Sequence, residues 1–392
     1  MSRPRVIVLR GHNVNVWDLR PLEQLTGEYD VSVALTGSNV HRVDGLGLPI
    51  VPARTPRDSL PAGRVAGAAA YAVGERYLGL RELLDGADVV HAAEIGTWFS
   101  AQAAKLRDAL GFKLVLTVWE TIAWRDAYRW PRERAYRRAV LPRADLYLAA
   151  TGRARDALLL EGVAPERVEV SPPGIDLERF GAVERSNGGF VLSAGRLVWE
   201  KGHQDVLRAI AALRQGIGGA PRRDLRLLVV GDGPEGKRLR AYADELGLAD
   251  VVEFRATVPY DEMPALYAAA SALVLASLPT RGWEEQFGMV LIEAMASGTP
   301  VVACASGAIP EVLDGAGTLV EPGDWRGLAR VLAEGPRTGA PDLARYSVEA
   351  VVAHGLGRGR GHREPRVYGH VRRAPSTRAY AAPIRSAAAS TE

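Results

Sequence analysis

Short apolar runs alternate with longer amphipathic segments along most of the 392-residue chain. Such runs are typical of strands buried on both faces of a parallel sheet, and the segments between them have the length of helices. The runs form two series separated by a turn-rich stretch at 171–189. We therefore predict two Rossmann-like, doubly wound α/β domains, at 1–175 and 176–347. Strands are expected at 6–9, 31–36, 89–91, 114–118, 146–149 and 168–170, and then at 190–194, 225–230, 251–255, 272–275, 301–304 and 318–320.

Residues 348–392 depart from this pattern. Residues 346–351 begin another helix, but from His354 onward the sequence is rich in Arg, Gly, Ala and Pro. That composition buries too little apolar surface to offset the loss of chain entropy, so we predict a disordered basic tail. The composition of the tail also resembles an out-of-frame reading of a GC-rich gene. A catalytically impaired protein is therefore an alternative to an active enzyme.

Composition narrows the class of protein. No apolar run reaches the roughly 18 residues of a membrane span, and the N-terminus enters a strand without the apolar core of a signal peptide. The single cysteine, Cys304, excludes an internal disulfide framework and favours the cytoplasm. The net charge is +3, and the tail from His354 holds eight Arg and two Glu, which leaves −3 for the rest. A body of that charge gives no indication of nucleic-acid binding.

A basic pair follows the first strand of the second series. Arg196 comes directly after Gly195, and Lys201 lies in the same loop. The carboxyl ends of parallel strands are where open α/β sheets bind ligands. An Arg supplies a planar fork for phosphate oxygens and a Lys a point charge, so the pair could neutralise a diphosphate. Only four lysines occur in the chain, which adds weight to Lys201; two solvated surface charges are the alternative.

A second candidate site combines two glutamates with the start of a helix. Glu285 and Glu293 are separated by seven residues, and the segment from Gly288 to Gly298 has the pattern of a helix. The first turn of a helix offers unpaired N–H groups and a positive dipole end, which together favour an anion. Glu293 lies in an otherwise apolar stretch, where a carboxylate needs hydrogen-bond partners, and ribose hydroxyls would suit it. A partly exposed helix position is the alternative.

Taken in order, these motifs resemble the retaining glycosyltransferases of family 4, which have the GT-B fold. The resemblance is dense over 190–335 and looser over 1–189. It implies a nucleotide-sugar donor, a glycan, lipid-linked or other hydroxyl acceptor, no cofactor, and a closing helix that returns to the first domain. By the same resemblance, donor contacts would come from Arg196, Lys201, Glu293 and the backbone of Phe287, Gly288, Met289 and Val290, and Glu285 would be the catalytic residue.

The resemblance also implies a mechanism. The family transfers hexose-type sugars with retention, and the leaving phosphate helps to deprotonate the acceptor on the same face. Positive side chains and the helix N-terminus would stabilise the leaving diphosphate. The chain contains no D-x-D pair, so we expect metal-independent transfer and no metal site.

The first half departs from the family at several positions. One glycine, Gly11, follows the first strand where many relatives carry two, and it would contact the donor phosphate. Trp119 stands where many relatives have a His, so Glu120 could contact a sugar instead. His91 ends a strand at the same sheet edge, and either a structural or a cleft-lining role is open.

A basic segment runs from Arg125 to Arg143, with seven Arg, two acids and three aromatic residues. Anionic membrane surfaces attract such segments, so peripheral attachment to the inner face of the membrane is possible. A salt-bridged, solvated helix pair is the alternative.

An NAD-linked oxidoreductase is the rival enzyme class. Gly231, Gly233 and Gly236 match the dinucleotide fingerprint after a strand. That fingerprint also needs an acid at the end of the next strand. Here Glu253 is internal to that strand and Arg255 follows it, which favours the glycosyltransferase.

Overall fold

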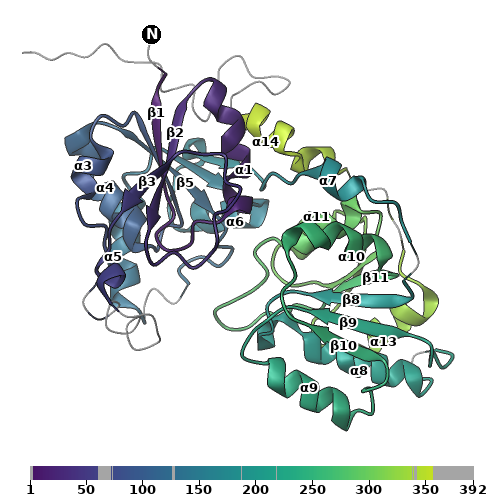
Figure 1. Ribbon diagram of the computed structural model, residues 1–392. Coiled ribbons are helices and arrows are strands. Elements are labelled where there is room, and N and C mark those ends of the chain that lie inside the picture. Colours follow the sequence, from purple (N-terminus) through teal and green to yellow (C-terminus); the bar gives the residue numbers. More distant parts are fainter. Residues whose placement is uncertain are drawn as a thin grey trace, which may run out of the picture.

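The computed structural model describes residues 3–60, 72, 74–125, 129–186, 188–217, 219–337, 339 and 342–355. Two α/β domains lie next to each other, each with a parallel sheet between helices (Figure 1). This is the predicted GT-B architecture, and its fold class is confirmed. The predicted tail at 356–392 lies outside the described residues, so its disorder stays a prediction.

The sheet of the first domain has the strand order β3-β2-β1-β4-β5-β6-β7, with all pairs parallel. Ile7 and Leu9 enter the core on one face of the sheet, and Val6 and Val8 enter the core on the other. Helices cover both faces because both are apolar. The strands are β1 (Arg5–Leu9), β2 (Asp30–Thr36), β3 (Ile50–Ala53), β4 (Val89–Ala93), β5 (Lys113–Val118), β6 (Leu146–Ala149) and β7 (Val168–Val170).

All six strands predicted for this domain are present, and β3 is an additional one. It escaped prediction because it is short and carries Pro52, which is tolerated only at a sheet edge. Helix ends follow local signals: the side chain of Thr97 caps α4 and that of Thr151 caps α6. The helices are α1 (Val16–Glu23), α3 (Leu80–Leu84), α4 (Trp98–Leu110), α5 (Pro131–Val140) and α6 (Gly152–Leu160).

The second domain repeats the architecture with the order β10-β9-β8-β11-β12-β13, again all parallel. The six predicted strands are all present. The strands are β8 (Phe190–Ala194), β9 (Arg226–Val230), β10 (Val252–Arg255), β11 (Ala272–Leu275), β12 (Val301–Cys304) and β13 (Thr318–Val320). The helices are α7 (Leu177–Gly181), α8 (His203–Arg214), α9 (Gly236–Glu245), α10 (Met263–Ala269), α11 (Met289–Ala296), α12 (Ile309–Leu313) and α13 (Trp325–Glu334).

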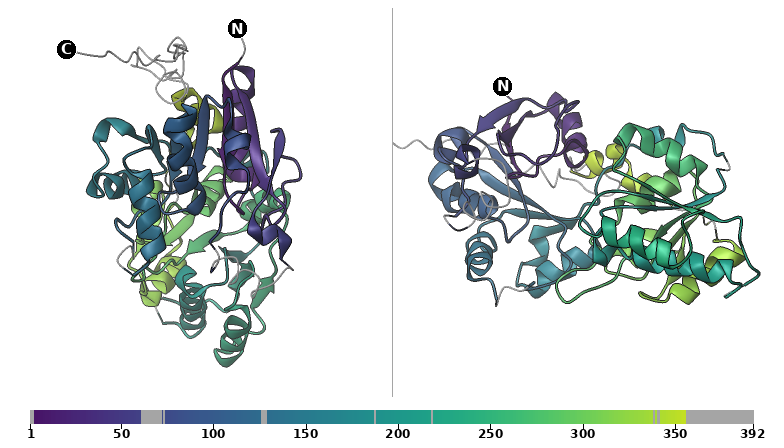
Figure 2. Two further views of the ribbon diagram at one scale, coloured as in Figure 1. Left: turned by 90° about the vertical axis from the view of Figure 1, so that its left-hand side faces the viewer. Right: turned by 60° about the horizontal axis from the view of Figure 1, so that its bottom comes forward.

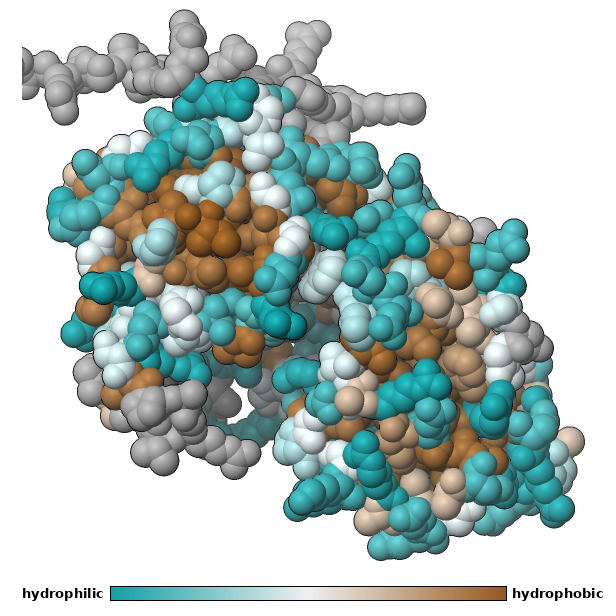
Figure 3. All heavy atoms as spheres, viewed as in Figure 1, coloured by the Kyte–Doolittle hydropathy of each residue, from teal (hydrophilic) through white to brown (hydrophobic). Residues whose placement is uncertain are grey.

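The chain returns to the first domain at its described end. Helix α14 (Val348–Gly355) packs against α1, and it lies beside α1 in two views (Figures 1 and 2). The N–H of Ile175 donates to the carbonyl of Tyr346, and Gln24 Nε2 donates to Glu349 Oε1 at 3.3 Å. A closing helix is therefore present, longer than the sequence pattern indicated. In the space-filling view the two domains touch at one end of their facing sides, and a hollow separates them over the rest of this face (Figure 3).

Candidate active site

The loop after β8 holds the predicted basic pair. Arg196 is exposed, whereas Lys201 ends a single 3₁₀ turn (Trp199–Lys201) and is largely buried. Gly202 follows with φ +71°, and a Cβ there would lie 1.8 Å from the carbonyl oxygen of Ala276. Only glycine permits this close approach, which brings Lys201 against the segment after β11.

Lys201 forms an ion pair with the predicted catalytic glutamate. Its Nζ lies 2.6 Å from Oε2 of Glu285, and the hydroxyl of Ser277 donates to the same oxygen at 2.7 Å. The ammonium also lies 5.3 Å from the centre of the Trp283 ring. Two residues 84 positions apart in the chain therefore meet at the carboxyl ends of β8 and β11.

Glu285 is held by its backbone as well as by its side chain. Its carbonyl accepts from the N–H of Ala308 at 2.8 Å. Gly307 has φ +57°, and a Cβ there would lie 2.1 Å from the same carbonyl oxygen. The loop after β12 thus fixes the position of Glu285, a contribution that sequence inspection missed.

The glycines of the dinucleotide-like motif pack against protein instead of facing open space. A Cβ on Gly231 would lie 1.9 Å from the carbonyl oxygen of Gly195, and one on Gly233 would lie 2.3 Å from that of Leu197. Leu197 also exchanges backbone hydrogen bonds with this loop, through Asp232 and Glu235. The fingerprint therefore has a structural explanation, since its glycines let two loops of the donor side meet.

The helix that begins after Glu285 links the two domains. Gly288, with φ +84°, precedes α11, and a Cβ there would crowd Leu291. The ring of Phe287 makes edge contacts with Trp119 of the first domain and with Tyr346. Met289 lines a cavity of the first domain, described below. The N-terminus of α11 therefore lies where the two domains face each other.

Glu293 has protein partners for both of its oxygens. Tyr260 donates to Oε1 at 2.8 Å and Tyr267 donates to Oε2 at 2.7 Å. Burial raises the pKa of this carboxyl, and the two hydroxyls oppose that change. The buried carboxylate thus does not need ribose to satisfy it, contrary to the argument from sequence. A carboxylate accepts about four hydrogen bonds, so the ribose contact stays a prediction.

Two acids of the second domain bind the start of α6 in the first. Glu284 forms a two-pronged ion pair with Arg153, at 2.5 and 2.9 Å. Glu311 accepts from the N–H groups of Gly152 and Arg153, at 2.6 and 3.1 Å. An acid at a helix N-terminus is stabilising. This contact fixes the domains beside Glu285, and no sequence motif indicated it.

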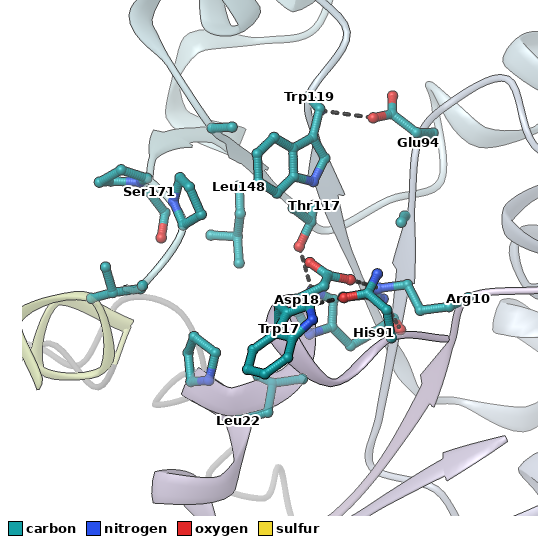
Figure 4. Close-up of a pocket in the computed structure, with 18 of the residues that line it drawn as sticks. Arg10, Trp17, Asp18, Leu22, His91, Glu94, Thr117, Trp119, Leu148 and Ser171 are labelled. Atoms are coloured by element: carbon teal, nitrogen blue, oxygen red, sulfur yellow. Dashed lines mark hydrogen bonds and ion pairs between the residues drawn. The ribbon is translucent and has the colours of Figure 1, made fainter. Parts of the chain in front are cut away.

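A cavity of the first domain has a volume of about 430 Å³ and lies at the carboxyl ends of β1, β4, β5 and β6. α1, α14 and Met289 of α11 complete its wall. Figure 4 shows Arg10, Asp18 and His91 gathered together, with Leu148 and Ser171 on the other side. Three of the predicted site residues line this cavity: His91, Trp119 and Met289. Through Met289 it borders the N-terminus of α11 of the second domain.

His91 is buried and neutral. Burial and the nearby positive charge of Arg10 hold its pKa well below the usual range. Nε2 lies 2.8 Å from the hydroxyl of Thr117, and Arg10 donates to the His91 carbonyl at 3.1 Å. These contacts account for a structural role, and they leave the ring at the cavity wall.

Glu94 is the cavity residue that sequence reasoning passed over. Its backbone has φ +61°, which is uncommon for a residue with a side chain and is found at functional sites. The N–H of Trp119 donates to Oε1 at 2.8 Å (Figure 4). Burial and then the charge of Glu120 raise the pKa of Glu94 to about 7, against backbone N–H donors. Neither the conformation nor the burial could be read from the sequence.

Two residues of the first domain that were predicted to contact substrate, Gly11 and Glu120, do not line the cavity. The N–H of Gly11 donates to the buried hydroxyl of Tyr77 at 2.9 Å, so this amide is not directed at a phosphate. Glu120 binds Arg125 and the N–H of Ile122, and it is not among the residues that line the cavity. Neither position supports the substrate contact proposed for it from sequence.

Two family models divide the chain between them. The model described as Glycosyltransferase Family 4 matches residues 8–179, and that described as Glycosyl transferases group 1 matches residues 175–334. A D-inositol 3-phosphate glycosyltransferase from Catenulispora acidiphila is 32% identical over 327 residues, which cover 76% of this chain and 75% of the relative. The chain belongs to glycosyltransferase family 4.

Other relatives of this family 4 glycosyltransferase match over shorter stretches. The D-inositol 3-phosphate glycosyltransferase of Streptomyces bingchenggensis is 35% identical over 57% of this chain and 50% of the relative. The 2-deoxystreptamine glucosyltransferase of Streptomyces kanamyceticus is 32% identical over 58% of this chain and 61% of the relative. The chain spans about half the length of the first curated relatives it matches.

Solved structures agree on the fold. The Anabaena protein HepE in complex with UDP and glucose superposes with a TM-score of 0.63 at 19% identity, over 90% of this chain and 95% of HepE. Sucrose-phosphate synthase from Thermosynechococcus elongatus has a TM-score of 0.63 at 21% identity, over 89% and 93% of the two chains. The two-domain arrangement of this glycosyltransferase is thus that of GT-B enzymes.

The basic segment of this family 4 glycosyltransferase is partly internal. Arg137 is buried and lies 2.8 Å from Glu161, and Arg125 pairs with Glu120. Arg132 and Arg138 are exposed on α5. No helix among the described residues is both long and apolar enough to cross a membrane.

Proposed function

We propose that the chain transfers a sugar from a nucleoside diphosphate donor, bound by the second domain, to a hydroxyl group of an acceptor in the cavity of the first. The observation that carries this proposal is the Lys201–Glu285 ion pair of 2.6 Å just before the N-terminus of α11. It gives one positive group for a leaving diphosphate and one carboxylate for the sugar, on the side of the domain that faces the cavity.

The donor contacts follow from charge. Arg196, Lys201 and the first N–H groups of α11 would stabilise the negative charge that develops on the leaving diphosphate. Glu285 would orient the transferred sugar and offset its positive character, because its oxygen is already fixed by Ser277. Glu293 would accept ribose hydroxyls through the lone pairs that its two tyrosine partners leave available.

The stereochemistry belongs to the same proposal. In our proposal, transfer retains the anomeric configuration, with the leaving phosphate taking the acceptor proton on the same face. Side-chain cations do the work of a metal, so activity is unchanged in excess EDTA. Loss of activity in EDTA with rescue by Mg²⁺ or Mn²⁺ would refute the metal-independent step without affecting the donor assignment.

The donor is a hexose-type nucleotide sugar, and UDP-glucose is the first to test because HepE binds UDP and glucose in the same fold. The printed names of the relatives suggest small cyclic alcohols as acceptors, beside glycan and lipid-linked ones. A panel of nucleotide sugars assayed for nucleotide release tests the proposal. Release that is equal in wild type, Glu285→Ala and Lys201→Ala would refute it.

Peripheral attachment to the inner face of the membrane is a separate proposal. It rests on the exposed Arg132 and Arg138 of α5 in an otherwise cytoplasmic enzyme. We expect co-sedimentation with anionic liposomes to weaken when both are changed to Gln. Binding that these changes leave intact would remove the proposal.

A further inference from the structure

The acceptor cavity offers little positive charge for an anionic ligand. Arg10 is the one Arg or Lys side chain among the described residues that line it. Its Nε lies 2.7 Å from Oδ2 of Asp18, and its Nη1 donates to the carbonyls of Leu9 and His91. The positive charge of this guanidinium is therefore already balanced by a carboxylate, and its Nε and Nη1 are engaged with protein partners.

The remaining charged groups of the lining are acids. Asp18 balances Arg10, and Glu94 adds a further carboxyl on the wall next to Trp119. His91 is neutral, so it supplies no second cation. A phosphate monoester brought into this cavity would lose its hydration without gaining a counter-charge, which is costly.

The rest of the lining combines apolar side chains with uncharged polar ones such as Asn15, Thr117 and Ser171. The apolar part comes from Trp17 and Leu22 of α1 with Trp119 and Leu148 (Figure 4), and Met289 also lines the cavity. The indole of Trp119 provides a flat surface for an apolar body, whereas the ring of Trp17 already packs against Tyr260, Arg20 and Arg179. The volume of about 430 Å³ lies within the range of small-molecule pockets, about 300–1,000 Å³.

We propose that this cavity binds an uncharged acceptor alcohol with an apolar ring or chain, and that it discriminates against phosphorylated acceptors. The apolar body lies against Trp119, Leu22 and Leu148, and the carboxyl of Glu94 receives a hydroxyl of the acceptor. This inference rests on the proposed function, because it assigns the acceptor of that reaction. It sets this chain apart from relatives named for a phosphorylated cyclitol.

A matched pair of probes tests the inference by direct binding. Phenyl β-D-glucoside and its 6-phosphate share one apolar ring and one sugar, and they differ by the phosphate. Isothermal titration of the full chain without donor should show the neutral probe binding at least tenfold more tightly. Equal binding, or tighter binding of the phosphate ester, would overturn the inference.

Two variants locate the cause of the discrimination. Asp18→Asn removes the counter-charge of Arg10, and Glu94→Gln removes the other carboxyl while keeping an oxygen for the Trp119 N–H. The titrations are run at pH 8, above the pKa of about 7 of Glu94, so that this carboxyl is ionised in the wild type. Each should tighten binding of the 6-phosphate about threefold or more, and Asp156→Asn on the exposed surface of α6 should not. If both fold, as circular dichroism can show, and neither tightens binding, the charge argument is wrong.

The binding experiment separates this inference from the proposed function. Probe binding needs no donor, so a chain that binds the neutral probe but releases no nucleotide from any nucleotide sugar contradicts only the proposed function. A chain that releases nucleotide but prefers the 6-phosphate contradicts only the acceptor class.

Discussion

The two walls of the interdomain cleft use glycine in different ways. In the second domain Gly202, Gly231 and Gly307 each bring one loop to within van der Waals contact of another backbone, where a Cβ would lie 1.8–2.1 Å from a carbonyl oxygen. In the first domain, the atoms nearest to a Cβ on Gly11 belong to the side chains of Phe99 and Trp98, and a Cβ on Gly174 would lie 2.8 Å from the Pro21 side chain and 3.1 Å from the Cα of Val348. The proposed donor wall, formed by the loops after β8, β9 and β12, is therefore held by backbone packing that tolerates no side chain, whereas the proposed acceptor wall, the cavity lining of the first domain, consists mainly of side chains. Short sequence motifs can record the first kind of wall but not the second.

The largest effect should come from the donor wall. Lys201→Ala removes the cation beside Glu285, and loss of one such charge-stabilising donor typically lowers turnover about 100- to 1,000-fold. Nucleotide release under saturating donor measures it. Lys237→Ala, an exposed lysine on α9, is the control and should leave turnover unchanged. Similar losses of turnover in both variants would show that Lys201 does not stabilise the leaving group specifically.

The backbone contact at Gly202 is the next test. Gly202→Ala places a methyl group 1.8 Å from the Ala276 carbonyl, so the two loops must move apart. We expect a loss of more than about 3 kcal/mol in unfolding free energy, measured by urea denaturation. Gly247→Ala has a similar φ of +68° but no neighbour within 4 Å, and should cost about 1 kcal/mol. Equal costs would mean that conformation alone, and not packing, demands glycine here.

Breaking the Arg153–Glu284 ion pair between the two domains should have a smaller effect on activity and stability. Arg153→Gln breaks the two-pronged ion pair with Glu284. Because the Arg153 side chain is half-exposed, we expect this ion pair to contribute only about 1 kcal/mol to the free energy of unfolding. We expect kcat/KM to fall about fivefold because Glu285 is the next residue in the chain. Arg155→Gln, on the same helix and paired only with Asp156, is the control and should have no effect. If the two variants behave alike, the interdomain bond does not position Glu285.

The smallest effect concerns the acceptor wall and depends on pH. The folded pKa of Glu94 is about 7, above its ordinary value of 4.5, because of burial and of Glu120, with Arg137 acting in the opposite direction. The folded state therefore binds this proton more tightly, and the associated stability, complete below about pH 4.5, is lost as the pH rises through about 7.

Glu94→Gln removes this titration. We expect the melting temperature of the variant minus that of the wild type to be about 2–4 °C higher at pH 8 than at pH 5. Such a shift corresponds to a loss of about 1 kcal/mol of wild-type stability over this pH range. Glu166→Gln makes the same chemical change at an exposed site, and its difference from wild type should be independent of pH. A flat difference for Glu94→Gln would mean that this carboxyl is already ionised at pH 5.

Much of the fold could be predicted from sequence because buried parallel strands leave continuous apolar runs. All twelve predicted strands are present, and the one missed, β3, is a short edge strand with Pro52. The return of α14 to α1 was only partly predicted, because the helical pattern of the sequence stops before the helix does.

In the candidate site, too, some residues could be predicted from local sequence and others could not. Lys201 and Glu285 stood out as motif residues, and the structure brings them together. Glu293 was expected to lack protein partners, but Tyr260 and Tyr267 supply them from 33 and 26 residues away in the chain. Glu94 gave no signal, because its strained backbone and its burial arise from neighbours on other elements.

The sequence by itself determined that this chain forms two doubly wound domains with a basic pair and a glutamate at one sheet edge, because periodicity, strand ends and helix starts are local properties. Only the tertiary structure decided which charges meet, that Arg10 is neutralised by Asp18, that Gly11 donates to Tyr77, and that α6 of one domain begins against acids of the other. Those outcomes depend on distances between residues far apart in the chain. Local propensity carries no information about such distances, whereas packing of the two domains fixes them.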